Sequence, residues 1–147
     1  MNILLPSGIN LLESLLPAAG CSLVTSQGLK FLLASREGRT AWCRILEPGG
    51  MPSSHAAVVS SLATAMGMLY GWSSAYFQIA LVFGCIVIYD AITLRRAVGE
   101  HARHINMLCS RDQELSTRVG LPEKLGHTPL EVLIGIAIGI LISLILV

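Results

Sequence analysis

AAVVSSLATAMGMLYGWSSAYFQIALVFGCIVIYDAITL, residues 56–94, is the stretch that decides the fold of this chain. Its first part, Ala56 to Trp72, is uncharged and rich in small residues. Its second part, Ser73 to Leu94, is apolar apart from Gln78 and Asp90. Almost no loop separates the two parts, so we expect a helical hairpin. The small residues of the first part favour close packing against other helices over contact with lipid.

The composition of the whole chain indicates an integral membrane protein. Of the 147 residues, 53% are hydrophobic and 13% are charged, whereas soluble domains carry roughly 25% charged residues. The mean hydropathy is +0.68. The net charge of +1 names no nucleic-acid partner, and the four cysteines have no metal-ligand spacing. We therefore expect one membrane domain over residues 1–147, with no cofactor and no bound metal.

Two further apolar segments complete the expected bundle. Residues 129–147 form the clearest one, about 19 residues long, which is enough to cross a bilayer; its Gly135 and Gly139 provide a packing surface. Residues 9–33 form the weakest one. A fifth segment, 98–118, has an amphipathic pattern and is expected to lie along the membrane surface over the site. The predicted fold class is all-α, with about four transmembrane helices and one interfacial helix, at approximate residues 9–33, 55–72, 73–94, 98–118 and 129–147.

The basic residues predict the orientation. If residues 56–94 form a hairpin, the segments on either side of it, 34–54 and 95–126, lie on the same side of the membrane. Both segments are basic, and basic loops are typical of the cytoplasmic side. The sequence therefore predicts a multi-pass membrane protein in which both segments face the cytoplasm.

Each of these segments ends in a motif that brings a histidine to the start of an apolar segment. One motif is Gly49-Gly50-Met51-Pro52-Ser53-Ser54-His55, and the other is Leu125-Gly126-His127-Thr128-Pro129-Leu130-Glu131. Helix N-termini carry unpaired N–H groups and partial positive charge, so they favour anions. With arginines nearby, the two motifs predict a phosphate pocket.

These motifs also carry a family resemblance. In their order and spacing, GGMPSSHAA, YDAITLRRAVGEHA and LGHTPLEVLIG resemble the divergent branch of the type 2 phosphatidic acid phosphatase and vanadium haloperoxidase superfamily. The resemblance runs from about Gln27 to the C-terminus and implies a helical membrane protein that acts on a lipid phosphate or prenyl diphosphate. Residues 52–55 match the second motif of the superfamily, and His127 followed by Glu131 matches the end of its third motif, with Glu in place of Asp.

The resemblance implies a role for each candidate residue. His127 would be the nucleophile that forms a phosphohistidine, Glu131 would orient it, and His55 would be the general acid. Glu37 and Leu121 stand where the superfamily has arginines, and the expected replacements are Arg95 and Arg96. The expected phosphate ligands are Lys30, Ser53, Ser54, Arg95 and Arg96, with Asp90 in support.

Several alternatives stay open at the level of sequence. Thr128-Pro129-Leu130-Glu131 is also a capping box, in which Glu131 would only close the helix start. Arg95 and His101 satisfy the motif spacing as well, although no acid follows His101 at the expected position. Asp90, Arg95 and Arg96 fit a structural ion pair or the positive-inside rule. The alternative function is a catalytically silent lipid-headgroup binder or scaffold, with a small transporter as a distant third, and the oligomeric state is left open.

Overall fold

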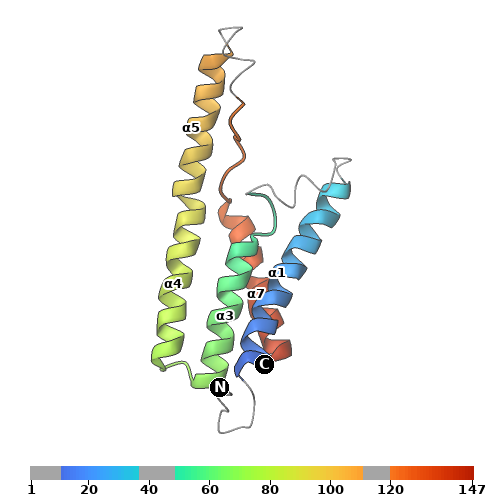
Figure 1. The fold of residues 1–147 in the computed structure, drawn as a ribbon, viewed down its shortest axis with the longest axis vertical. Coiled ribbons are helices and arrows are strands. Elements are labelled where there is room, and N and C mark those ends of the chain that lie inside the picture. The colour runs from blue at the N-terminus through green and yellow to red at the C-terminus, as the bar shows by residue number, and fades with distance from the viewer. Residues whose placement is uncertain (1–10, 37–48, 111–119) are drawn as a thin grey trace.

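The computed structural model describes residues 11–36, 49–110 and 120–147, and these ranges contain helices joined by short connections. The predicted all-α bundle is confirmed. With the labels of Figure 1, its helices are α1 (Leu11–Arg36), α3 (Ser54–Tyr70), α4 (Ala75–Ile92), α5 (Leu94–Cys109) and α7 (Pro129–Leu146). The amphipathic helix begins at Leu94, before its predicted start, and the predicted residues 111–118 lie outside the described ranges.

Helix α3 is the centre of the bundle, because it packs against α1, α4 and α7. Its side chains facing these neighbours are small, and buried positions include Ala56, Ala57, Ala63 and Ala65. Helices α3 and α7 begin at the same end of the bundle, where α1 ends (Figure 1). The two histidine motifs therefore meet at one end of the molecule.

The contact between α3 and α7 is made by residues without bulk. Gly135 and Gly139 are buried on α7, and a Cβ added at Gly139 would collide with the carbonyl oxygen of Ala57. Further along, the hydroxyl groups of Ser61 and Ser143 lie 2.8 Å apart, and that of Ser143 also donates to the Ser61 carbonyl oxygen at 2.7 Å. Both serines are fully buried. Small residues thus bring the two backbones close together, as expected in helices that pack within a membrane.

The predicted hairpin between α3 and α4 is present. Gly71 ends α3 at φ +91°, a conformation that favours glycine. The hydroxyl of Ser74 then accepts a hydrogen bond from the amide of Phe77 at 3.2 Å and begins α4. A short turn of this kind places α4 antiparallel beside α3.

Helices α4 and α5 form one long rod. Between them stands Thr93, whose amide donates to Tyr89, and the amide of Ala97 donates to Thr93, both at 2.9 Å. Thr93 itself is a turn residue with φ −102° and ψ −72°, and the nearby carbonyl oxygen of Ala91 accepts from the amide of His127 at 3.0 Å, so the regular helical pattern is interrupted at the junction. Beyond it, α5 continues in the direction of α4 outside the bundle (Figure 1). This differs from the expectation that the amphipathic helix folds over the site, because α5 runs on in the direction of α4.

Among the described helices, two are long and apolar enough to cross a membrane. One is the α4–α5 rod, Ala75–Cys109, and the other is α7, each with an 18-residue stretch of mean hydropathy 2.0 or above. Aromatic side chains gather at the hairpin end, where the rings of Trp72 and Phe77 meet edge to face at 5.1 Å. Aromatic residues are typical of the membrane–water boundary. The site-bearing end of the bundle is the opposite one.

Candidate functional site

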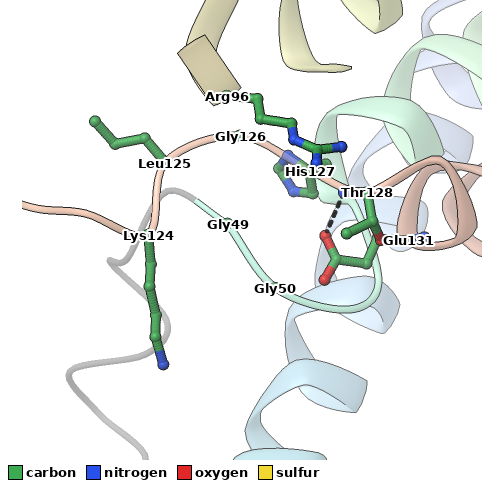
Figure 2. A pocket seen from close by; sticks show the side chains of 9 residues that line it. All are labelled: Gly49, Gly50, Arg96, Lys124, Leu125, Gly126, His127, Thr128 and Glu131. Carbon is green, nitrogen blue, oxygen red and sulfur yellow. Dashed lines mark hydrogen bonds between the residues drawn. The ribbon is translucent and has the colours of Figure 1, made fainter. Parts of the chain in front are cut away.

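A cavity of about 350 Å³ lies at the end of the bundle where α7 begins. Its walls come from the Gly49–Gly50 segment, the start of α5 and the segment that leads into α7 (Figure 2). The lining residues are Gly49, Gly50, Arg96, Lys124, Leu125, Gly126, His127, Thr128 and Glu131. Segments far apart in sequence thus build one cavity, which Gly49 and Gly50 of the first motif and His127 of the second line, whereas His55 does not line it.

Backbone geometry holds His127 at this cavity. Gly126 has φ +83°, and a Cβ at this position would lie 2.6 Å from the backbone nitrogen of Arg96. The next amide, that of His127, donates to the carbonyl oxygen of Ala91 at 3.0 Å. Glycine is needed here both for the left-handed conformation and for the close approach to α5. The result is a histidine side chain that is only 5% exposed.

The second predicted histidine lies beside the first. His55 is the second residue of α3, whose start is capped by the buried Ser53: its hydroxyl accepts from the amide of Ala56 at 3.4 Å. The amide of Ser53 donates to the carbonyl oxygen of Glu131 at 3.0 Å, which ties the start of α3 to α7. The ring centroids of His55 and His127 are 6.2 Å apart, nearly perpendicular. The fold therefore brings the two histidines together, with His55 the more exposed.

Burial and charge both favour the neutral form of His127. Desolvation is the main cause that lowers its pKa below the ordinary value of 6.5, and the cations Lys30 and Arg95 act in the same direction, as does His55. The carboxylate of Glu131 opposes them. The Nδ1 atom of His127 is buried and has no hydrogen-bond partner among the described residues. Buried polar atoms nearly always have a partner, so this unpaired nitrogen marks His127 as a functional candidate.

Glu131 forms the capping box that the sequence allowed. Its carboxylate accepts from the amide of Thr128 at 3.0 Å, and its own amide donates to the Thr128 hydroxyl at 3.3 Å (Figure 2). Pro129 occupies the first turn of α7. No hydrogen bond joins Glu131 to His127 within the described part of the chain. Glu131 thus acts on His127 through space, by its charge, in this arrangement.

The two neighbouring arginines have different surroundings. Arg96 lines the cavity, and its side chain extends toward His127 in Figure 2. Arg95 instead forms an ion pair with Asp90, with 2.8 Å between Nε and Oδ2, although its charge still acts on His127. Arg96 also lies 3.6 Å from a carboxylate oxygen of Glu100 in an exposed pair. Of the two, Arg96 is the better placed to meet a ligand.

Two lysines complete the positive surroundings. Lys30 is only 6% exposed, and its Cε would contact a Cβ added at Gly50, which lines the cavity. Lys124 lines the cavity directly but was not among the residues selected from sequence. In the sequence, the one feature that could have pointed to Lys124 is its place in the same loop as His127. In Figure 2 its side chain points away from His127, so it reaches the cavity margin.

The remaining candidates, Ser53, Ser54 and His101, do not line the cavity. Ser54 is the half-buried first residue of α3, and the Ser53 hydroxyl is engaged in the cap. His101 is exposed on α5 and does not line the cavity, so the geometry favours His127 over this rival. Within residues 11–36, 49–110 and 120–147, no cluster of three His, Cys, Asp or Glu side chains could hold a metal ion.

Comparison with known proteins gives a consistent result. The family described as "Divergent PAP2 family" matches residues 11–142. The uncharacterized membrane protein YuiD of Bacillus subtilis (strain 168) is 36% identical over 118 residues, with 71% of this chain and 75% of the relative covered. No solved structure matches this chain significantly.

Proposed function

The chain belongs to the divergent PAP2 family of membrane proteins, and on that premise we propose that it hydrolyses a lipid phosphate or prenyl diphosphate through a phosphohistidine. One observation carries the proposal. His127 is a buried histidine with an unpaired ring nitrogen, it lines a cavity with cationic surroundings, and its ring centroid lies 6.2 Å from that of His55. A buried polar atom left without a partner costs free energy. Within the described residues, no protein group offsets that cost at His127.

The proposed reaction begins with neutral His127. A ring nitrogen of His127 attacks phosphorus, and the bond from phosphorus to the leaving oxygen breaks. His55 gives a proton to that oxygen as a general acid; burial, with the charges of Arg95 and Lys30, holds its pKa below the ordinary 6.5, against the charge of Asp90. Water then attacks the phosphohistidine, His55 takes a proton from it, and phosphate leaves with His127 regenerated. The low pKa of His127 supports the first step, because the nucleophile stays unprotonated.

Charge stabilisation in this scheme comes from the cations around the cavity. Arg96 offers a planar set of donors that fits phosphoryl oxygens in pairs. Lys30 and Lys124 add positive charge, and Arg95 contributes from its pair with Asp90. Glu131 stabilises the imidazolium by its charge while it caps α7. Fixed charges of this kind favour the transition state because charge builds on the oxygens.

We also propose that the chain crosses the membrane several times and that the cavity faces the cytoplasm. The basic residues near the cavity support this orientation. The test is labelling of Cys109, at the end of α5, by an impermeant thiol reagent. Labelling is expected from the cytoplasmic side alone, and labelling from the outside would overturn the orientation. Cys43, which we expect on the same side, lies outside the described residues.

A catalytically silent headgroup binder is the second candidate. The engagement of Glu131 in the capping box favours it, because within the described residues this carboxylate is not hydrogen-bonded to His127. Such a protein would bind phosphate at the same cavity without turnover. It would also keep the fold that the glycine and serine contacts between α3 and α7 provide.

Hydrolysis by purified protein separates the two candidates. The assay measures phosphate release from a panel of lipid phosphates and prenyl diphosphates. We expect turnover by the natural protein, its loss in His127→Ala, and its retention in His104→Ala. His104 is a matched control because it is exposed on α5, with Nδ1 2.8 Å from the carbonyl oxygen of Glu100. Equal activity in His127→Ala and the natural protein would refute the phosphohistidine. Binding of vanadate by a protein without turnover would establish the silent binder.

A further inference from the structure

The outer half of the α4–α5 rod carries an apolar surface that the described part of the chain leaves uncovered. Leu94, Val98, Ile105 and Leu108 are between 43% and 65% exposed. They lie on α5, which extends beyond the bundle (Figure 1). Met107, which lies off this row, is 54% exposed as well. Large apolar side chains on one projecting helix require an explanation, because soluble surfaces seldom expose a contiguous apolar patch.

The spacing of these residues is that of a coiled coil. Residues 94, 98, 101, 105 and 108 follow each other at intervals of four and three, which places 94, 101 and 108 at d positions and 98 and 105 at a positions. The a positions are Val and Ile, and the outer d positions are both Leu. β-Branched residues at a with Leu at d favour two parallel strands. His101, at the middle d position, is the single polar residue in this seam.

The neighbouring side of α5 is already occupied. The segment that returns toward α7 packs there, and a Cβ at Gly99 would lie 2.7 Å from the carbonyl oxygen of Glu123. The Asn106 side chain donates to the carbonyl oxygen of Leu121 and accepts from the Leu121 amide, at 2.9 and 3.0 Å. These contacts support α5 as a straight helix outside the bundle. They leave the seam of residues 94, 98, 101, 105 and 108 facing outward.

The bilayer does not fit as the occupant of this seam. Asp90 and Arg95 mark the end of the apolar part of the rod, and α5 continues from there along the same axis. A helix of 16 residues at about 1.5 Å per residue extends roughly 24 Å. If α4 spans the membrane, most of the seam stands away from the lipid.

We propose that the seam of α5 binds the same seam of a second copy of this chain, forming a parallel two-stranded coiled coil. Copies in one membrane share one orientation, so their α5 helices project in the same direction and at the same height. The rod also exposes Tyr76 and Phe83 on α4 at 59% and 57%. These two side chains extend the exposed apolar surface along the rod. Two heptads alone are short for a stable coil, but anchoring in one membrane raises the effective concentration of the partners.

Site-specific cross-linking in membranes tests the parallel register. In a variant whose four natural cysteines are replaced by serine, Leu108→Cys places a thiol in the seam. Arg103→Cys places one on the far side of the same helix, because 103 is an f position. We expect a disulfide-linked dimer from Leu108→Cys and only single chains from Arg103→Cys. Equal cross-linking of the two, or none from either, would overturn the proposal.

A second measurement uses the chain with its natural cysteines. In mild detergent the natural protein should have a particle mass, corrected for detergent, of twice the 15.7 kDa of one chain. Ile105→Lys should halve that mass with no change in helical circular dichroism, and Arg103→Lys should leave it unchanged. A single-chain mass for the natural protein, or a two-chain mass for Ile105→Lys, would contradict the coiled coil. The result is independent of phosphatase activity, because none of these residues lines the cavity.

Discussion

Replacement of Glu131 by glutamine distinguishes the two roles that this residue could have. In the structure its carboxylate accepts one hydrogen bond, from the Thr128 amide at 3.0 Å, at the start of α7. Glutamine keeps an acceptor at the same place but loses the charge. The exchange of a charged for a neutral hydrogen bond, together with the lost interaction with the helix dipole, should cost about 1–2 kcal/mol of stability. That amount should lower the melting temperature without preventing folding.

The effect on catalysis should be small if Glu131 caps and acts only by its charge. Removing its charge lowers the pKa of His127 further, because Glu131 is the group that raises it. His127 is then still neutral at pH 7, so kcat/KM should fall by less than about tenfold, or about 1.4 kcal/mol. A residue that orients the nucleophile through a hydrogen bond would instead cost about 10⁴ in kcat.

The measurement is phosphate release at pH 7 together with thermal denaturation of the same preparations. Thr128→Ala is the matched control, because it removes the other half of the capping box and should cost about 1 kcal/mol of stability. Both variants should keep most of the activity. If Glu131→Gln lost activity by a factor of 10³ while Thr128→Ala did not, the capping interpretation would be refuted and Glu131 would be assigned to orient His127.

Three further predictions follow from the same geometry. Arg96→Lys should raise KM more than Arg95→Lys, because Arg96 lines the cavity whereas Arg95 is paired with Asp90; equal effects in steady-state kinetics would contradict this division. The acid limb of kcat/KM should lie below pH 6.5, because burial lowers the pKa of His127 and activity is lost only as pH falls through that lowered value; an acid limb above 6.5 would exclude His127 as the group observed. Gly126→Ala should cost at least about 1–2 kcal/mol in backbone strain and displace His127, with a large loss of activity. Gly120→Ala, whose Cβ would have nothing within 4 Å, should be tolerated in the same assays.

Sequence alone was sufficient for the helices, because hydropathy and small-residue content are properties of the segments themselves. The uninterrupted apolar run of residues 129–147 and the short Gly71–Ser74 connection predicted α7 and the hairpin, which the structure confirms. The hairpin in turn predicted that the two histidine motifs share one end of the bundle. Helix boundaries were less predictable, because caps such as Ser53, Ser74 and Thr128 fix them by local hydrogen bonds.

The direction of α5 was decided only by tertiary structure. Its amphipathic pattern is equally typical of a helix on a membrane surface and of a helix with a protein partner. What distinguishes them is the backbone conformation at Thr93, after which α5 continues in the direction of α4, and the packing of the return segment on Gly99. Neither feature is encoded in a periodic pattern. The first depends on one local conformation, and the second depends on residues that are distant in the chain.

The chemistry of the site divides in the same way between sequence and structure. The sequence determined that His55 and His127 each stand at a helix start and that basic residues are near, because these are features of short motifs. It left open whether Glu131 caps or orients, which of Arg95 and Arg96 meets the cavity, and whether Lys124 takes part. Those questions depend on side-chain direction and on contacts between α3, α5 and the loop before α7. The folded chain places Arg96 and Lys124 at the cavity and Glu131 in the capping box, because burial and hydrogen bonding arise from several segments at once.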